Sequence, residues 1–260
     1  MKLIGRYDNF IFDLYGTLID INTDENAISF WKKIADIYSC YGADYTPAGI
    51  REKYLELCAM EEKKLQKKNG SPYPEIKLEK VFKALYIKAE NRHDTAFNPR
   101  LEELTVFVAN AFRTLSEKYL KLYPGTMKVF DELKKAGKKI YLLSNAQAVF
   151  TVPEMERLGI YDKFDDVFIS SDLGRKKPDP EFLNALIKKH KLDPKKSIMV
   201  GNEIEADMGI ALACGMDGAY INVYHMTERE IDKRIKPLRA GKGKGCKIYK
   251  YLSGDIEDMV

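Results

Sequence analysis

The residue of this chain that most clearly suggests chemistry is Asp13, a carboxylate at the end of a short apolar run. Residues 10–12 are Phe-Ile-Phe, which is typical of a buried strand, and residues 13–20 read as a tight turn. Open α/β sheets bind their ligands in the crevice outside the carboxyl ends of the parallel strands. A carboxylate in that position can attack an electrophile and form a covalent aspartyl intermediate. The sequence therefore predicts that Asp13 is a nucleophile.

Further polar side chains follow three other apolar runs. They are Ser144 after residues 140–143, Lys177 after residues 167–169, and Asn202, Glu203 and Asp207 after residues 198–200. If these runs are parallel strands, their carboxyl ends bring all of these side chains to one edge with Asp13. A hydroxyl and an ammonium suit phosphate oxygens, and the other oxygens suit Mg²⁺, which offsets the repulsion between an anionic nucleophile and an anionic phosphate. The set predicts phosphoryl chemistry.

The elements that would position these residues alternate along the second half of the chain. Strands are expected at residues 140–143, 167–169, 197–200, 219–223 and 248–252. Helices are expected between them, with starts at Pro124 and Asp179-Pro180 and ends at Gly137, Gly159 and Gly215. Such alternation predicts a doubly wound, mostly parallel α/β sheet covered on both faces. We expect this core domain to comprise residues 1–20 and 119–260.

Residues 21–118 have a different pattern. Apolar residues recur at helical spacing around Trp31, Tyr54 and Phe82, and along a helix that is expected to start at Asn98-Pro99. No strand is expected here. The pattern predicts an all-helical cap domain inserted between the first strand and the rest of the sheet, with Trp31 in its core.

Composition places the chain among ordinary globular proteins. Hydrophobic residues make up 45% and charged residues 32% of the 260, and 43 basic against 39 acidic side chains leave a net charge of +4. This small excess does not favour nucleic acid or membrane binding, and no apolar run approaches the roughly 18 residues that span a bilayer. The four cysteines are scattered, and residues 1–6 lack the apolar core of a signal peptide. We therefore expect a cytoplasmic protein with reduced thiols, and both a monomer and a homodimer stay open.

Two other features have a plain and a functional interpretation. Residues 229–250 are rich in cationic residues and include the Gly/Lys segment 240–245. This segment lacks the strand-then-helix context of a phosphate-binding loop. We expect it to be a mobile, solvated loop. His93 lies between two predicted cap helices. It could supply an acid or base to a covered active site, although a solvated loop is the commoner case.

Four short motifs, in order along the chain, resemble those of the haloacid dehalogenase superfamily, which contains many phosphatases. Asp-Leu-Tyr-Gly-Thr at residues 13–17 resembles the first motif, Asp-x-Asp-Gly-Thr, and Leu-Leu-Ser-Asn at 142–145 resembles the second. Lys-Pro-Asp-Pro at 177–180 is similar to the third, and Gly-Asn-Glu-Ile-Glu-Ala-Asp at 201–207 is similar to the fourth, Gly-Asp-x-x-x-x-Asp. The helical stretch after the first motif resembles the family's α-helical cap, so the resemblance spans nearly the whole chain.

This resemblance implies a Mg²⁺-dependent phosphatase that acts on a small phosphorylated metabolite through an aspartyl-phosphate. The residues it implies are catalytic Asp13, Tyr15 and Lys177, substrate-binding Thr17, Ser144, Asn145 and Lys177, and metal-binding Asp13, Tyr15 (through its carbonyl oxygen), Asn202 and Asp207.

Two positions depart from the phosphatase pattern. The family's phosphatases carry Asp two residues after the nucleophile, to protonate the leaving group and then activate water, and this chain carries Tyr15 there. A phenol with a pKa near ~10 is a poor base at neutral pH, and general acid–base help is worth roughly 10²–10⁴-fold. We therefore expect weak activity that favours good leaving groups. Asn202 stands where a metal-binding Asp is usual, so one negative charge is gone, and Glu203 could compensate.

Two alternatives stay open. The true haloacid dehalogenases use Asp-x-Tyr-Gly-Thr and no metal, which resembles residues 13–17, but they carry an arginine early in the cap. Arg51 is the first arginine of this cap, and its spacing is too long. The other alternative is a catalytically weakened relative that binds a ligand or a partner.

Overall fold

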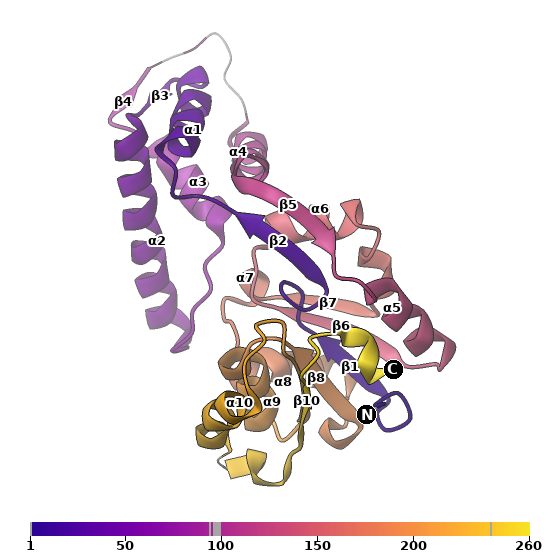
Figure 1. Ribbon diagram of the computed structural model, residues 1–260. Coiled ribbons are helices and arrows are strands. Elements are labelled where there is room, and N and C mark those ends of the chain that lie inside the picture. Colours follow the sequence, from indigo (N-terminus) through magenta and orange to yellow (C-terminus); the bar gives the residue numbers. More distant parts are fainter. Residues whose placement is uncertain (1, 94, 96–99, 240) are drawn as a thin grey trace.

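The computed structural model describes residues 2–93, 95, 100–239 and 241–260. Figure 1 shows a sheet with flanking helices at one end of the molecule and a group of helices at the other, joined by a long ribbon. The α-helices are α1 (Ile28–Cys40), α2 (Pro47–Asn69), α3 (Leu78–Ile87), α4 (Leu101–Ser116), α5 (Thr126–Lys135), α6 (Ala148–Arg157), α7 (Ser170–Leu173), α8 (Pro180–His190), α9 (Gly209–Ala213) and α10 (Glu228–Ile235). The strands are β1 (Asn9–Phe12), β2 (Ile19–Thr23), β3 (Ala43–Asp44), β4 (Asn91–Arg92), β5 (Glu117–Leu122), β6 (Lys139–Ser144), β7 (Asp166–Ile169), β8 (Ser197–Gly201), β9 (Asp217–Ile221) and β10 (Ile248–Tyr251).

The main sheet has six strands in the order β10-β9-β8-β1-β6-β7, and every neighbouring pair is parallel. β1 lies between β6 and β8, with Phe12 opposite Leu142 on one side and Val200 on the other. The predicted doubly wound parallel sheet is confirmed. Each of the six predicted strands forms, with ends shifted by at most two residues.

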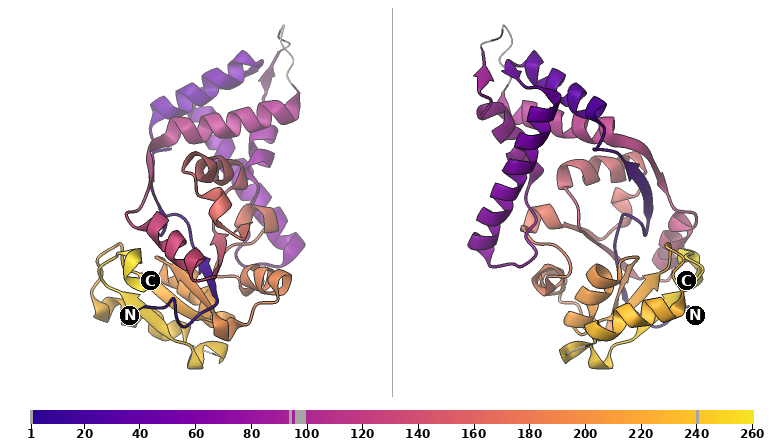
Figure 2. Two further views of the ribbon diagram at one scale, coloured as in Figure 1. Left: turned by 90° about the vertical axis from the view of Figure 1, so that its right-hand side faces the viewer. Right: turned by 60° about the vertical axis from the view of Figure 1, so that its left-hand side comes forward.

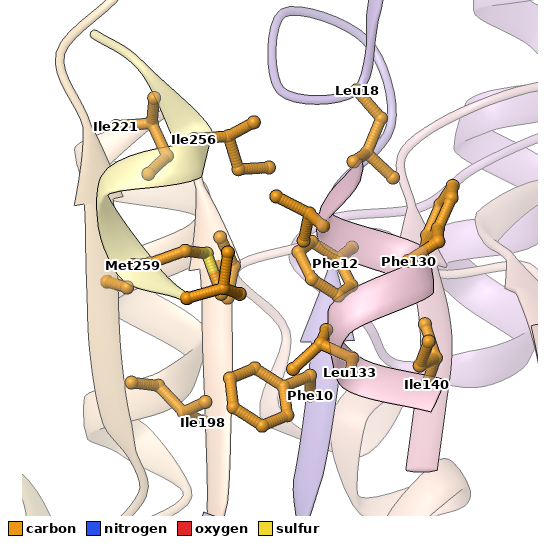
Figure 3. Packing of buried hydrophobic residues seen from close by; sticks show 14 of the residues in the cluster. Phe10, Phe12, Leu18, Phe130, Leu133, Ile140, Ile198, Ile221, Ile256 and Met259 are labelled. Carbon is orange, nitrogen blue, oxygen red and sulfur yellow. The ribbon is translucent and has the colours of Figure 1, made fainter. Parts of the chain in front are cut away.

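Alternate residues of β1 enter the hydrophobic cores on opposite faces of the sheet. Phe10 and Phe12 pack beside Phe130 of α5, with Met259 of the C-terminal 3₁₀ helix on the same side (Figure 3). Ile11 belongs to a second cluster, formed with residues of α8 and α9. Helices therefore cover both faces, and β1 is buried on both sides, which fixes the position of the turn that follows it.

The helical part has a hydrophobic cluster of its own, at the other end of the molecule from the sheet (Figure 2). Trp31 is buried in it as predicted, in edge-on contact with Phe30 and Phe112. Phe150 of α6 also belongs to this cluster, although α6 follows a strand of the main sheet. One helix of the α/β part thus contributes to the packing of the helical part.

The prediction that residues 21–118 contain no strand was wrong. β2 and β5 pair in antiparallel fashion, with Ile19 opposite Leu122, and β3 pairs with β4. These strands have two to six residues, and their pairing partners are distant in the chain, so local periodicity gives little signal. The β2–β5 ribbon lies across both predicted domain boundaries, and the domain division stays a prediction. The expected helix start at Asn98-Pro99 lies outside the described residues, and α4 begins at Leu101.

The Gly/Lys segment also differs from expectation. Gly241–Gly245 forms a short 3₁₀ helix, and a Cβ added at Gly243 would lie 2.9 Å from the Cβ of Leu212 in α9. The backbone therefore packs closely on α9, so these five residues form a short helix rather than the expected loop, and their mobility stays a prediction. Residue 240 lies outside the described part of the chain. Within the described part, no helix is both long and apolar enough to cross a bilayer.

Candidate active site

Asp13 lies directly beyond β1, with 7% of its surface exposed. Its backbone N–H donates a hydrogen bond of 2.8 Å to the carbonyl oxygen of Val200 in β8, so the parallel hydrogen-bonding pattern continues to this residue. Because β6 and β8 flank β1, the residues at their carboxyl ends lie on either side of Asp13. The sheet thus brings the predicted residues of the second and fourth motifs to the predicted nucleophile.

The ammonium group of Lys177 lies between two carboxylates. Its Nζ is 2.5 Å from Oδ1 of Asp13 and 2.7 Å from Oδ1 of Asp207. Asn145 holds the backbone of the lysine: the Lys177 N–H donates to Asn145 Oδ1 at 2.8 Å, and Asn145 Nδ2 donates to the Lys177 carbonyl oxygen at 3.1 Å. Asn145 was predicted to bind substrate, but in the structure its side chain binds the backbone of Lys177.

Thr17 and Asn202 meet on the other side of Asp13. The Thr17 hydroxyl is 3.0 Å from Asn202 Oδ1 and 3.3 Å from Asp13 Oδ2, so its single proton can serve either oxygen. Gly16 permits this approach. It has a φ of +83°, and a Cβ there would lie 2.3 Å from Asn202 Nδ2. Any side chain at position 16 would displace Asn202.

Asp207 is fully buried and lies against the end of β8. A Cβ at Gly201 would come within 2.1 Å of its Oδ2, which explains the glycine before Asn202. The backbone N–H of Glu203 donates to the same Oδ2 at 2.9 Å. Burial raises the pKa of Asp207 to about 7, with the Lys177 ammonium lowering it and the Asp13 carboxylate raising it. Burial opposes the charge of Lys177, yet the two carboxylates hold its pKa above its usual value.

Ser144, the last residue of β6, has a buried hydroxyl with no hydrogen-bond partner among the described residues. An unsatisfied buried hydroxyl costs about 1–3 kcal/mol, which a ligand oxygen at this place would relieve. A cavity of about 450 Å³ opens beside the cluster, and Lys177, Asn202 and Tyr224 are among the residues that line it. Tyr224, whose hydroxyl accepts from Asn202 Nδ2 at 3.2 Å, was not predicted from the sequence.

The side chain of Tyr15 takes part in a different cluster. Its hydroxyl donates to Glu154 Oε2 at 2.5 Å and lies 3.0 Å from the hydroxyl of Thr151, both on α6. Burial and the negative charge of Glu154 raise the pKa of Tyr15 well above its usual value, so the phenol stays protonated. Glu154 was not predicted from the sequence. Its position could have indicated burial, because Glu154 follows Phe150 by four residues and so lies on the same, apolar face of α6.

Two cap residues considered from the sequence lie elsewhere. The His93 side chain is 56% exposed, and its Nδ1 is 3.2 Å from a carboxylate oxygen of Asp44, beside the β3–β4 pair at the far end of the cap from the sheet (Figure 1). That position argues against a role for His93 as an active-site acid or base. Arg51 is exposed on α2.

With this geometry established, comparison with known proteins identifies the family. The model of the haloacid dehalogenase-like hydrolases matches residues 7–215. The chain belongs to this family. All four motif segments identified in the sequence lie within the matched residues.

Among curated relatives, the chain is 25% identical to the glyceraldehyde 3-phosphate phosphatase of Methanothermobacter thermautotrophicus, over 63% of this chain and 75% of the relative. It is 33% identical to the protein of that name from Methanocaldococcus jannaschii, over 37% of this chain and 42% of the relative. It is also 33% identical to the phosphoglycolate phosphatase of Vibrio vulnificus, over 35% of this chain and 40% of the relative. The chain thus spans less than half the length of the last two relatives.

Solved structures show the same fold. A haloacid dehalogenase-like hydrolase from Bacteroides fragilis has a TM-score of 0.52 at 18% identity, covering 95% of this chain and 99% of that one. The 2-haloacid dehalogenase of Pseudomonas syringae has a TM-score of 0.53 at 18% identity, covering 83% of this chain and 86% of that one.

The donor chemistry of the site fits a magnesium ion. Asp13, Asn202 and Asp207 offer side-chain oxygens, the ligands that Mg²⁺ prefers. The part of the chain that the structure describes has no group of three or more His, Cys, Asp or Glu residues that could hold a metal, so amide and carbonyl oxygens would have to complete the set. Asp13 and Asp207 also set two carboxyl groups against the single Lys177 ammonium, so a dication would add the positive charge that the second carboxylate lacks.

Proposed function

We propose that this protein is a Mg²⁺-dependent phosphatase that hydrolyses a small phosphorylated metabolite through Asp13. The observation that carries the proposal is the buried cluster in which Lys177 joins Asp13 and Asp207, at 2.5 and 2.7 Å, near the end of β6, where the Ser144 hydroxyl has no partner among the described residues. A nucleophilic carboxylate beside a cation and an unused hydroxyl suits a phosphoryl group. The curated relatives, which are named as phosphatases, support the same chemistry.

In the proposed reaction, an oxygen of Asp13 attacks phosphorus, and the bond from phosphorus to the leaving-group oxygen breaks. The products are an aspartyl-phosphate and an alkoxide, which takes a proton from water and leaves hydroxide. A second water then attacks the phosphorus and gives a proton to that hydroxide, and the bond to the Asp13 oxygen breaks to release inorganic phosphate and restore the carboxylate. Lys177, Thr17 and Ser144 donate hydrogen bonds to the phosphoryl oxygens and stabilise the charge of the transition state.

The proposed magnesium ligands are the carboxylates of Asp13 and Asp207, the amide oxygen of Asn202 and the backbone carbonyl oxygen of Tyr15. A bound ion would neutralise the repulsion between the anionic nucleophile and the anionic phosphate. Because Asn202 is neutral, the site has one carboxylate fewer than the family's phosphatase motif provides, and we expect weaker metal binding than a second Asp would give.

The relatives and the replacement at position 15 together define the substrates to test first. The relatives are named for glyceraldehyde 3-phosphate and phosphoglycolate, so we propose a short phosphorylated metabolite in the cytoplasm as the substrate. Tyr15 stands where the family's phosphatases carry an acid–base Asp. We therefore expect slow turnover of alkyl phosphates and faster turnover of acyl and aryl phosphates, whose leaving groups need little protonation.

The test is phosphate release from p-nitrophenyl phosphate, acetyl phosphate, glyceraldehyde 3-phosphate and phosphoglycolate, with and without Mg²⁺. We expect Mg²⁺-dependent release that falls by about 10³-fold or more in Asp13→Asn, because the nucleophile is lost. Asp162→Asn is the matched control, since that aspartate is 76% exposed and outside the site. Equal activity in Asp13→Asn and wild type, or no release from any of the four compounds, would contradict the proposal.

A second candidate is dehalogenase-like hydrolysis, in which Asp13 displaces halide from carbon. Its support is Tyr15 together with the direct contact of Lys177 with Asp13, which offsets one carboxylate charge without a metal. This candidate also needs a cation in the cap to bind the halide, and half-buried Arg113 is already paired with Glu154 at 2.5 Å. Metal-independent chloride release from 2-chloropropionate would favour this candidate. Ligand binding without turnover of either compound class would favour a weakened relative with a binding role.

A further inference from the structure

One buried carboxylate joins the turn that carries the nucleophile to the cap. Glu154 of α6 is 4% exposed, and its Oε2 accepts the hydrogen bond of the Tyr15 hydroxyl at 2.5 Å. Its Oε1 accepts from Nε of Arg113, in cap helix α4, also at 2.5 Å. The family resemblance assigns no role to Glu154 or Arg113. Glu154 is buried and Arg113 is half-buried, and the proposed reaction uses neither charged group.

The helix that carries Glu154 is fixed to the cap along one face. Phe150, one turn earlier, lies parallel to Phe112 of α4 with an interplanar angle of 4° and 6.4 Å between ring centroids. Arg157, nearly one turn later, pairs with Glu117 at the start of β5 at 2.6 Å. The guanidinium of Arg113 lies 5.5 Å from the ring centroids of both Tyr15 and Phe150. The position of α6 therefore depends on the docked cap.

The same helix also holds the first-motif turn in place. Tyr15 lies between Asp13 and Thr17 in a turn that four backbone hydrogen bonds close. Gly16 N–H donates to the Ile19 carbonyl oxygen at 2.8 Å, and three N–H groups donate to the Leu14 carbonyl oxygen, those of Thr17, Leu18 and Ile19, at 3.3, 2.8 and 2.9 Å. None of these four bonds uses a backbone group of Tyr15. The Tyr15 hydroxyl adds a side-chain anchor to Glu154 and Thr151, residues almost 140 positions away in the chain. Loss of that anchor would free the turn that sets the direction of the Asp13 carboxylate and of the Tyr15 carbonyl oxygen.

We propose that Tyr15 is a positioning residue rather than a substitute acid–base. Its hydroxyl, held by Glu154 and Thr151, fixes the nucleophile turn, and Arg113 makes that arrangement depend on cap docking. The kinetic test of this inference rests on the proposed phosphatase function, whereas the structural test does not.

The kinetic test compares Tyr15→Phe and Glu154→Gln with wild type on aryl phosphates whose leaving groups span a range of pKa. A positioning role predicts that both variants lower kcat/KM by about 10–100-fold, by the same factor for every substrate, because misplacement of the nucleophile affects all of them alike. An acid role for Tyr15 predicts a loss that grows with leaving-group pKa. Tyr161→Phe and Glu156→Gln are matched controls, since Tyr161 is 40% exposed and Glu156 is exposed on the same helix as Glu154.

The structural test is amide hydrogen exchange of residues 13–19 in the same variants. We expect faster exchange in Tyr15→Phe and Glu154→Gln and wild-type exchange in the two controls. The inference would be overturned if amide exchange stayed at the wild-type rate in both Tyr15→Phe and Glu154→Gln, or if kcat/KM was unchanged in both. A loss of kcat/KM that grows with leaving-group pKa would also overturn it. If the wild type releases no phosphate at all, the proposed function fails, and exchange alone decides whether the tyrosine anchors the turn.

Tyr15→Asp separates the two roles most sharply. If position 15 lacks only an acid, this variant should exceed wild-type activity, and that result would overturn the inference. Under the positioning role its activity falls below wild type, because the new carboxylate stands near buried Glu154 and the phenol anchor is gone.

Discussion

Two buried ionic clusters start from the same turn, and they differ in how their hydrogen bonds are satisfied. Asp13 enters the first cluster, where Lys177 bridges two carboxylates and the buried Ser144 hydroxyl has no partner among the described residues. Tyr15, two residues later, enters the second, where both oxygens of Glu154 accept hydrogen bonds and the tyrosine hydroxyl has two partners. A cluster that binds a ligand keeps donors unused until the ligand arrives, whereas a structural cluster has its polar atoms paired within the protein.

Among the substitutions that test this contrast, the largest effect is expected from removal of the Lys177 cation in the first cluster. Lys177→Met keeps the length of the side chain but leaves two buried carboxylates without a counter-charge. Loss of one partner of a buried pair costs about 3–5 kcal/mol of unfolding free energy, and loss of a charged donor to the phosphoryl group lowers kcat by about 10²–10³-fold. Urea unfolding and phosphatase assays measure the two effects. Lys176→Met, beside it in the chain and half-exposed, is the control.

A variant with near wild-type kcat would contradict the role of Lys177 in the reaction. If activity were lost while the unfolding free energy stayed the same, the ion pairs of Lys177 with Asp13 and Asp207 would be contradicted. The two buried carboxylates would then not need the ammonium for stability.

A smaller effect is expected from restoring a charge at the metal site. Asn202→Asp replaces an amide oxygen by a carboxylate oxygen without a change of shape. We expect the Mg²⁺ concentration for half-maximal activity to fall about tenfold, because each added carboxylate strengthens binding of a hard cation. Titration of activity with Mg²⁺, and calorimetric titration with Mg²⁺ alone, measure the change. An unchanged midpoint in both would show that residue 202 is not a metal ligand.

The smallest expected effects compare one hydroxyl from each cluster. Ser144→Ala removes the hydroxyl that has no partner, so stability should stay the same or rise by up to about 1 kcal/mol while kcat falls about 10-fold or more. Thr151→Val removes a paired hydroxyl of similar burial, so stability should fall by about 1 kcal/mol. Thermal unfolding at one pH ranks the two variants. If Ser144→Ala proves the less stable, the contrast between the clusters fails.

Local pattern was enough to predict the parallel sheet and the polar side chains that follow its strands. Runs such as residues 10–12 and 140–143 are apolar because the strands are buried on both faces, and that burial is visible in the sequence without knowledge of the partner strands. Since the carboxyl ends of parallel strands share one edge, the convergence of Asp13, Lys177 and Asp207 followed from the order of the elements alone. Their distances in the structure confirm that inference.

Tertiary structure alone decided the direction of side chains, such as Tyr15, that combine an apolar ring with a polar group. Tyr15 reads in the sequence as an altered catalytic residue, yet its hydroxyl binds Glu154, and nothing local to either residue identifies the other as its partner. The β2–β5 ribbon was hidden for the same reason. Periodicity records which positions are buried, whereas the pairing of polar groups depends on contacts between distant segments, and those exist only once the chain has folded.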